Sequence, residues 1–244
     1  MSLGLGSSLS SPVYKQQTAA YAVTRSVDLD GTNQHIIITN SVADDIKNIG
    51  SVSIWFKSDA AHQNDTFFNL HTDTSNDNKI ALLYLDASSK IRLNCRGGST
   101  NTIIDAELTH DDSSWVHLVA TWDRTANKMA IYVNGDSIQT GTNAIANFAT
   151  TANKIYLGKP GNADNAFFDG HLSSLSLWTA ALSSANVLTL YNGGKPGNVS
   201  ASGISNLAAW LPLDETSGNF IDRTSTGADG VPINTPTQGV ADVP

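Results

Sequence analysis

The sequence predicts two strands and two turns in Trp115-Val-His-Leu-Val-Ala-Thr-Trp-Asp-Arg-Thr-Ala-Asn-Lys-Met-Ala-Ile-Tyr-Val-Asn-Gly135. The run from Val116 to Trp122 has the period-two pattern of a half-buried strand. A polar turn at 123–128 separates it from a second alternating run at 129–133. Asn134-Gly135 closes this second strand with a strong hairpin signal, because both residues tolerate a positive φ. The stretch therefore predicts an antiparallel sheet.

Further short strands are predicted on both sides of this hairpin. Val27 and Leu29 alternate with Asp28 and Asp30, and the turn at Gly31 ends the run. Later candidates are 35–39, 67–71, 80–85, 91–95 and 102–106. Strands this short, with a turn signal about every ten residues, are typical of a sandwich or a jelly roll.

One helix is predicted near residue 184. Ser183 or Ser184 supplies the N-cap, Val187 and Tyr191 have helical spacing, and Gly193-Gly194 ends the helix. The fold class expected is all-β, an antiparallel two-sheet jelly-roll sandwich with this single short helix.

Composition excludes two classes of partner. The 244 residues carry a formal net charge of −8 and contain no run of Lys and Arg, so nucleic-acid binding is not expected. No apolar stretch approaches the ~20 residues of a membrane-spanning helix, so membrane insertion is not expected either. Cys95 is the only cysteine, which rules out an intrachain disulfide and favours a small core residue.

Five segments resemble the laminin-G-like and pentraxin-like domains of the concanavalin A-like lectin/glucanase superfamily. Their order and spacing match the family over roughly residues 23 to 195. They are Ser51–Lys57, Trp115–Gly135, Ile155–Gly158, Phe168–Trp178 and Ala181–Gly193. The resemblance implies a concanavalin A-like sandwich.

The domain organisation follows from these patterns. Residues 1–22 are predicted to form an extended N-terminal arm, 23–236 a single laminin-G-like sandwich, and 237–244 a tail. A stretch near 207–214 resembles the opening strand of a laminin-G-like domain, yet too few residues follow it to form another core. We therefore expect this strand to fold back into the sandwich beside residues 27–35.

Catalysis by the route of the superfamily's glucanases is not expected. The retaining glucanases of the superfamily carry two catalytic glutamates on one strand, in an E-x-D-x-E motif. The carboxyl groups of these two glutamates must lie about 5 Å apart. This chain has only two glutamates, Glu107 and Glu215, and neither stands in that motif. His117, on the strand of the central hairpin, is predicted to be structural.

Calcium is the cofactor that the resemblance implies. Many members of the superfamily hold it at a sandwich edge with Asp carboxylates and backbone carbonyl groups. Asp30 and Asp169 are the predicted ligands, because they match the family's D-G turn and the residue beside its F-x-G strand. The alternative is that Asp and Asn simply favour turns.

Glycan binding on such a scaffold uses an exposed aromatic ring and amide or carboxylate groups on loops. Most of the tryptophans match strand positions of the family and are expected in the core. The predicted surface candidates are Asn162, Asp164, Asn165 and Phe167.

The first function predicted is that of a non-enzymatic virion surface protein, such as a phage capsid decoration, head fibre or tail appendage. The first ten residues lack the features of a secretory signal, and no disulfide or catalytic pair is present. Its partners would be other virion proteins and further copies of itself, with docking by Leu3, Leu5 and Leu9 and weak adhesion to cell-surface glycans. The alternative is a stand-alone carbohydrate-binding or adhesion module, in which calcium would assist binding.

Overall fold

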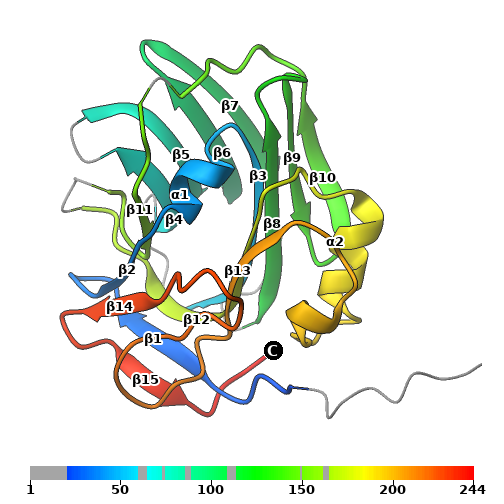
Figure 1. The fold of residues 1–244 in the computed structure, drawn as a ribbon. Helices are drawn as coiled ribbons and strands as arrows, with labels where there is room; N and C mark the ends of the chain where they lie inside the picture. Colours follow the sequence, from blue (N-terminus) through cyan, green and yellow to red (C-terminus); the bar gives the residue numbers. More distant parts are fainter. Residues whose placement is uncertain are drawn as a thin grey trace, which may run out of the picture.

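The computed structural model describes residues 21–59, 65–72, 75–85, 89–108, 114–148, 150–161 and 165–244. It confirms the all-β class, with two antiparallel sheets packed face to face (Figure 1). Residues 1–20, including Leu3, Leu5 and Leu9, lie outside the described residues, so the predicted arm and its docking stay predictions.

Sheet A contains the hairpin from which the fold was predicted. Within it, Asn134 and Gly135 have φ values of 50° and 89°, as the hairpin signal requires. The strands run, in spatial order, β10 (Asp136–Gly141), β9 (Lys128–Val133), β8 (Val116–Asp123), β3 (Ile49–Ser58), β12 (Asp169–Trp178), β1 (Ser26–Asp30) and β15 (Thr237–Val240).

Sheet B forms the opposite layer of the sandwich. Its strands run, in spatial order, β14 (Gly230–Ile233), β2 (His35–Thr39), β11 (Lys154–Leu157), β4 (Asp65–Thr72), β5 (Ser75–Leu85), β6 (Lys90–Gly97) and β7 (Thr100–Glu107). Alternate residues of these strands enter the core, because successive side chains of a strand point to opposite faces. Thus Leu93 and Cys95 of β6 are buried in the core, and Asn94 lies on the outer face.

The predicted helix is present as α2 (Ser184–Tyr191). Ser183 caps it by accepting a hydrogen bond from the backbone N–H of Asn186, and Asn192 ends it in the left-handed conformation. The helix covers part of the outer face of sheet A, where it closes a second apolar cluster. Members of that cluster include Val119, Tyr132, Trp178, Val187, Leu190 and Trp210.

Two further short helical segments accompany α2. They are α1 (Val42–Ile46) and a 3-10 turn, η2 (Val199–Ala201), neither of which the sequence patterns predicted. Among the helices of the described ranges, none is long and apolar enough to cross a membrane.

The C-terminal region adds strands to both sheets. β13 (Leu207–Leu211) pairs with Leu175–Trp178 of β12, whereas β1 pairs with 169–172 of the same strand. β3 pairs with the other side of β12. β13 and β1 therefore lie end to end along the same side of β12, and the prediction that the strand near 207–214 lies beside residues 27–35 is wrong. The expected tail at 237–244 contains β15, which pairs with β1; Figure 1 shows this red strand beside the blue one.

Candidate functional site

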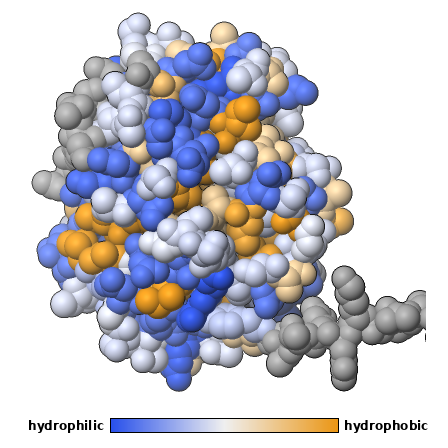
Figure 2. Space-filling view, viewed as in Figure 1, coloured by the Kyte–Doolittle hydropathy of each residue, from blue (hydrophilic) through white to orange (hydrophobic). Residues whose placement is uncertain are grey.

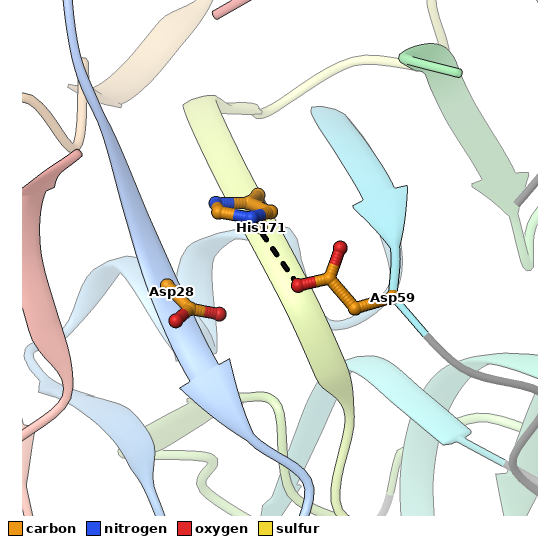
Figure 3. A group of neighbouring side chains, drawn as sticks. All are labelled: Asp28, Asp59 and His171. Carbon is orange, nitrogen blue, oxygen red and sulfur yellow. Dashed lines mark ion pairs between the residues drawn. The ribbon is translucent and has the colours of Figure 1, made fainter. Parts of the chain in front are cut away.

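The outer face of sheet A carries a polar group where β1, β12 and β3 lie side by side. Asp28 of β1 is directly opposite His171 of β12. Their sequence neighbours Leu29 and Leu172 are buried in the core, so the two polar side chains point outward. Asp59, the residue after β3, joins them (Figure 3).

These three side chains form the acidic group, a name used below for Asp28, Asp59 and His171. One potential ligand atom of each lies within 4.8 Å of the others. His171 Nε2 is 3.3 Å from Asp59 Oδ2, and its buried Nδ1 has no hydrogen-bond partner in the part of the chain that the structure describes. Figure 3 shows Asp28 and Asp59 on either side of the strand that carries His171, so the three side chains could share a cation.

The charge around Asp28 favours binding of a cation or a proton. Burial raises the pKa of its carboxyl above the usual value, and the nearby carboxylates of Asp59, Asp169 and Asp30 raise it further. The attraction of His171 opposes this shift only in part. A positive ion at this point would relieve the repulsion among the carboxylates.

The predicted calcium ligands, Asp30 and Asp169, lie directly opposite each other on β1 and β12. Asp30 Oδ1 accepts the backbone N–H groups of Thr32 at 2.9 Å and Asn33 at 3.3 Å, so the turn already uses this oxygen. Burial alone would raise the pKa of Asp30, but these backbone hydrogen bonds lower it below its usual value. Calcium binding by the pair stays a prediction.

The C-terminal segment lies across the sheet close to the acidic group. Asp242 accepts a hydrogen bond from Trp115 Nε1 at 2.8 Å and forms an ion pair with Lys57. Its backbone carbonyl accepts a hydrogen bond from the Ser26 hydroxyl at 2.6 Å. Burial raises the pKa of Asp242, but the Lys57 and Trp115 contacts outweigh it and lower the pKa.

A different set of polar side chains lies on the outer face of sheet B. The strand register places Asn69, Ala81 and Asn94 in one row across β4, β5 and β6. Lys79 and Arg96 are opposite each other in the adjacent row. Asn69, Lys79, Asn94 and Arg96 are called the sheet B polar face below.

Two amide oxygens of the sheet B polar face are buried without a protein partner. Asn69 is 3% exposed and Asn94 9% exposed, and Oδ1 of each has no hydrogen-bond partner among the described residues. Because a buried polar atom is nearly always hydrogen-bonded, each oxygen lacks a partner that a water molecule or a ligand group would supply.

The same face holds a cation that no described carboxylate neutralises. Lys79 forms none of the ion pairs found among the described residues. Burial lowers the pKa of its amine, and the positive charge of Arg96 lowers it further. Among the described residues, Lys79 therefore keeps an uncompensated positive charge on this face, although the chain as a whole is acidic.

The predicted glycan-binding residues are only partly described. Asn162 and Asp164 lie outside the described residues, and Asn165 is exposed at the surface. The expectation of an exposed ring at Phe167 is wrong: it is 7% exposed, because it packs beside His35 and the Lys159 ammonium lies 5.7 Å from its ring centre. A role of these residues in sugar binding stays a prediction.

The two glutamates occupy separate elements. Glu107, at the end of β7, pairs with Lys90 at 3.0 Å, and Glu215, which follows β13, pairs with Arg223 at 2.9 Å. His117 is 1% exposed, and burial lowers its pKa to about 3, so it is neutral at physiological pH. Its Nε2 lies 2.8 Å from the Ser53 hydroxyl, an arrangement that fits the predicted structural role.

Known proteins share this architecture. A family model described as the concanavalin A-like lectin/glucanases superfamily matches residues 30–188. The pentraxin-related protein PTX3 of Bos taurus is 27% identical over 100 residues, which are 37% of this chain and 26% of PTX3. The chain thus spans about a quarter of that curated relative.

Solved structures extend the likeness to most of the chain. A heptameric SAP-like pentraxin from Limulus polyphemus has a TM-score of 0.64 at 18% identity, covering 91% of this chain and 97% of its own. The Ruminococcus gnavus IT-sialidase CBM40 bound to alpha2,3 sialyllactose has a TM-score of 0.57 at 13% identity, covering 70% of this chain and 100% of its own. At these identities the matches establish the fold.

The family model covers more than half of the 244 residues. The chain therefore belongs to the concanavalin A-like lectin/glucanases superfamily, as its sequence motifs predicted.

Proposed function

We propose that this chain is a non-catalytic carbohydrate-binding domain. The superfamily includes lectins and glucanases, and the glutamates decide between them. The superfamily's retaining glucanases use two glutamates of one strand, about 5 Å apart, and the nearby carboxylates of Asp28 and Asp59 stand in no such motif. Glu107 and Glu215 lie on separate elements, each in an ion pair with a basic residue, and the sequence contains no other glutamate. This separation is the observation that carries the proposal.

The sheet B polar face is the proposed sugar-binding surface. Sugars present hydroxyl groups, and each hydroxyl can donate a hydrogen bond to an amide carbonyl oxygen. Asn69 Oδ1 and Asn94 Oδ1 offer two such acceptors on neighbouring strands. Ala81 stands between them in the same row, with a side chain smaller than either amide.

The charge of this face favours an acidic sugar. Lys79 is half-buried beside Arg96, and a carboxylate or sulfate group would neutralise its charge. We therefore propose an oligosaccharide that carries a carboxylate or a sulfate. The sialyllactose bound to the related CBM40 fold supports a sugar of this class.

The test is a glycan array followed by calorimetric titration of the purified chain. Wild-type protein should bind sialylated or sulfated glycans, and Asn94→Ala should weaken binding about tenfold, since a hydrogen bond to a charged or polar ligand contributes about 1.4 kcal/mol. Lys128→Gln is the matched control, because Lys128 is exposed on β9 of the other sheet. A folded protein that binds no glycan would overturn the proposal.

Assembly is a second part of the proposal. The heptameric pentraxin supports a homo-oligomer of this chain, in which several weak sugar contacts act together. Light scattering of the purified chain tests this, and a monomer at every concentration would overturn it. The comparisons favour the carbohydrate-binding alternative over the virion role, which remains a prediction together with the virion location.

A further inference from the structure

We propose that the acidic group, Asp28, Asp59 and His171, binds a divalent transition metal ion such as Zn²⁺, Mn²⁺ or Co²⁺. Asp28 and His171 lie on the neighbouring strands β1 and β12, and Asp59 directly follows β3, the next strand of the same sheet. Strand-borne side chains are held more precisely than loop side chains, which suits a metal site.

The distances within the group fit metal coordination. Ligand atoms that each lie about 2.0–2.2 Å from a tetrahedral metal are about 3.3–3.6 Å apart. His171 Nε2 and Asp59 Oδ2 already have a separation of 3.3 Å. Asp28 contributes an oxygen within 4.8 Å of both, and a small side-chain rotation would bring it to the same spacing. Water would complete the coordination.

An independent observation at His171 points to a ligand. The residue is 9% exposed, and its Nδ1 has no hydrogen-bond partner among the described residues. In Figure 3 the ring lies between the two carboxylates, with one nitrogen toward Asp59 and the other on the side of Asp28. Because Nδ1 has no partner among the described residues, no protein contact fixes the tautomer, and the ring can offer the lone pair of Nε2, the nitrogen beside Asp59, to a metal ion.

The ligand set selects the class of metal. Calcium and magnesium prefer oxygen ligands throughout, whereas an imidazole nitrogen with two carboxylates suits zinc, manganese or cobalt. The surrounding carboxylates of Asp30 and Asp169 add negative charge that attracts any divalent cation. The site thus differs from the calcium pair that the sequence predicted, although it lies on the same two strands.

Metal binding would join β1 to β12 and β3. β1 is held in sheet A by β12 on one side and by the C-terminal strand β15 on the other. A metal bridge from Asp28 to His171 and Asp59 would therefore fasten this edge of the sandwich, independently of sugar binding on sheet B.

The experiment uses the full chain, stripped of metal by a chelator and dialysed. Titration with Co²⁺ is followed by visible absorption, and Zn²⁺, Mn²⁺ and Ca²⁺ are titrated by calorimetry. We expect one Co²⁺ or Zn²⁺ per chain, with affinity at least tenfold higher than for Ca²⁺. His171→Gln and Asp28→Asn should each lower the affinity at least tenfold, and Asp136→Asn on β10 should not change it.

Two results would overturn the proposal. One is an unchanged Co²⁺ spectrum and affinity in His171→Gln, which would place the metal at other residues. The other is binding of Ca²⁺ alone or of no metal by folded wild-type protein. Asp28→Asn guards against misfolding as an explanation, because removing one of the repelling carboxylates should leave the metal-free protein at least as stable as wild type.

Discussion

The outer faces of the two sheets differ in charge. On sheet A, Asp28, Asp59 and His171 gather where three strands meet. On sheet B, Lys79 and Arg96 lie opposite each other on β5 and β6. Both groups occupy the outward positions of alternating strands, so the core does not require them. Within the described part of a chain of net charge −8, a pair of carboxylates thus lies on one outer face and a pair of basic residues on the other.

The two faces also differ in what covers them. Helix α2 packs over the end of sheet A that contains His117, whose ring stacks on Trp55 at 4.8 Å and on Tyr191 at 6.0 Å. The acidic group lies on a part of sheet A that the helix does not cover. On the face shown in Figure 2, hydrophobic residues form separate groups among hydrophilic ones. Function is therefore expected where the sheets are not covered by a helix.

The largest effect is expected from a glycine beneath the acidic group. A Cβ at Gly170 would collide with the backbone carbonyl of Lys57, and rigid backbone cannot move aside. At Gly161, near the sheet B polar face, a Cβ would meet side-chain atoms alone, those of His71 at 2.6 Å and Asn69 Oδ1 at 3.3 Å. We expect Gly170→Ala to cost about 3 kcal/mol or more of unfolding free energy, and Gly161→Ala less, measured by urea denaturation.

Gly98→Ala is the control for backbone strain. Gly98 also has a positive φ, 56°, but a Cβ there would touch nothing within 4 Å. Its substitution should cost about 1 kcal/mol, the penalty of the left-handed conformation alone. Equal losses for Gly170→Ala and Gly98→Ala would show that the β3–β12 contact does not constrain this edge.

The second prediction concerns the pH dependence of the unfolding free energy. It compares His117, which lies beneath helix α2, with His171, which the helix does not cover. Burial lowers the pKa of His117 from 6.5 to about 3, so protonation favours the unfolded chain. This contribution to stability is complete above pH 6.5 and is lost as the pH falls toward 3, at up to about 1.4 kcal/mol per pH unit. His117→Gln should flatten that slope in urea titrations, whereas His171→Gln should preserve it. A slope that His117→Gln leaves unchanged would mean that another group controls acid unfolding.

Many strands were predictable because short, local sequence patterns determine them. Val116–Trp122 alternates, Asn134-Gly135 demands a hairpin, and Ser183 caps a helix, and each of these appears in the structure. β15 was missed, since Thr237–Val240 is short, contains a glycine and has no apolar alternation.

The acidic group was not predictable, because it depends on strand order. Alternation indicates that Asp28 points away from the core, but not that residues 59 and 171 are its neighbours. The family motifs came close, since Asp30 and Asp169 do lie opposite each other. Likewise, the alternation of Arg92, Asn94 and Arg96 shows that these residues share a face, but only the register identifies Lys79 as their neighbour.

The third prediction tests the charge of the sheet B polar face. Lys79→Gln should weaken binding of a sialylated or sulfated glycan about tenfold in calorimetry, because a charge-assisted hydrogen bond is lost. Binding of a neutral glycan should be unaffected, and Lys128→Gln should change neither. If Lys79→Gln binds acidic and neutral glycans as the wild type does, the positive charge of this face does not select the ligand.

The smallest effect is expected at Asp28. Its pKa is raised in the folded chain by burial and by neighbouring carboxylates, so this residue contributes less to stability as the pH rises from 3.8 through the raised value. In chelator at pH 7, Asp28→Asn should therefore be more stable than wild type, by less than about 1 kcal/mol after solvent screening. The difference should vanish below pH 3.8.

Adding Zn²⁺ should reverse the order of the two proteins, since only the wild type gains the full set of ligands and with it the stabilisation that ligand binding gives the folded state. Thermal unfolding with and without metal measures both effects, and Asp136→Asn on β10 is the control for loss of a carboxylate elsewhere on sheet A. If Asp28→Asn is less stable than wild type in chelator, the Asp28 carboxylate already has a favourable partner within the chain. Asp28 would then give no support to the proposal that this part of sheet A attracts a cation.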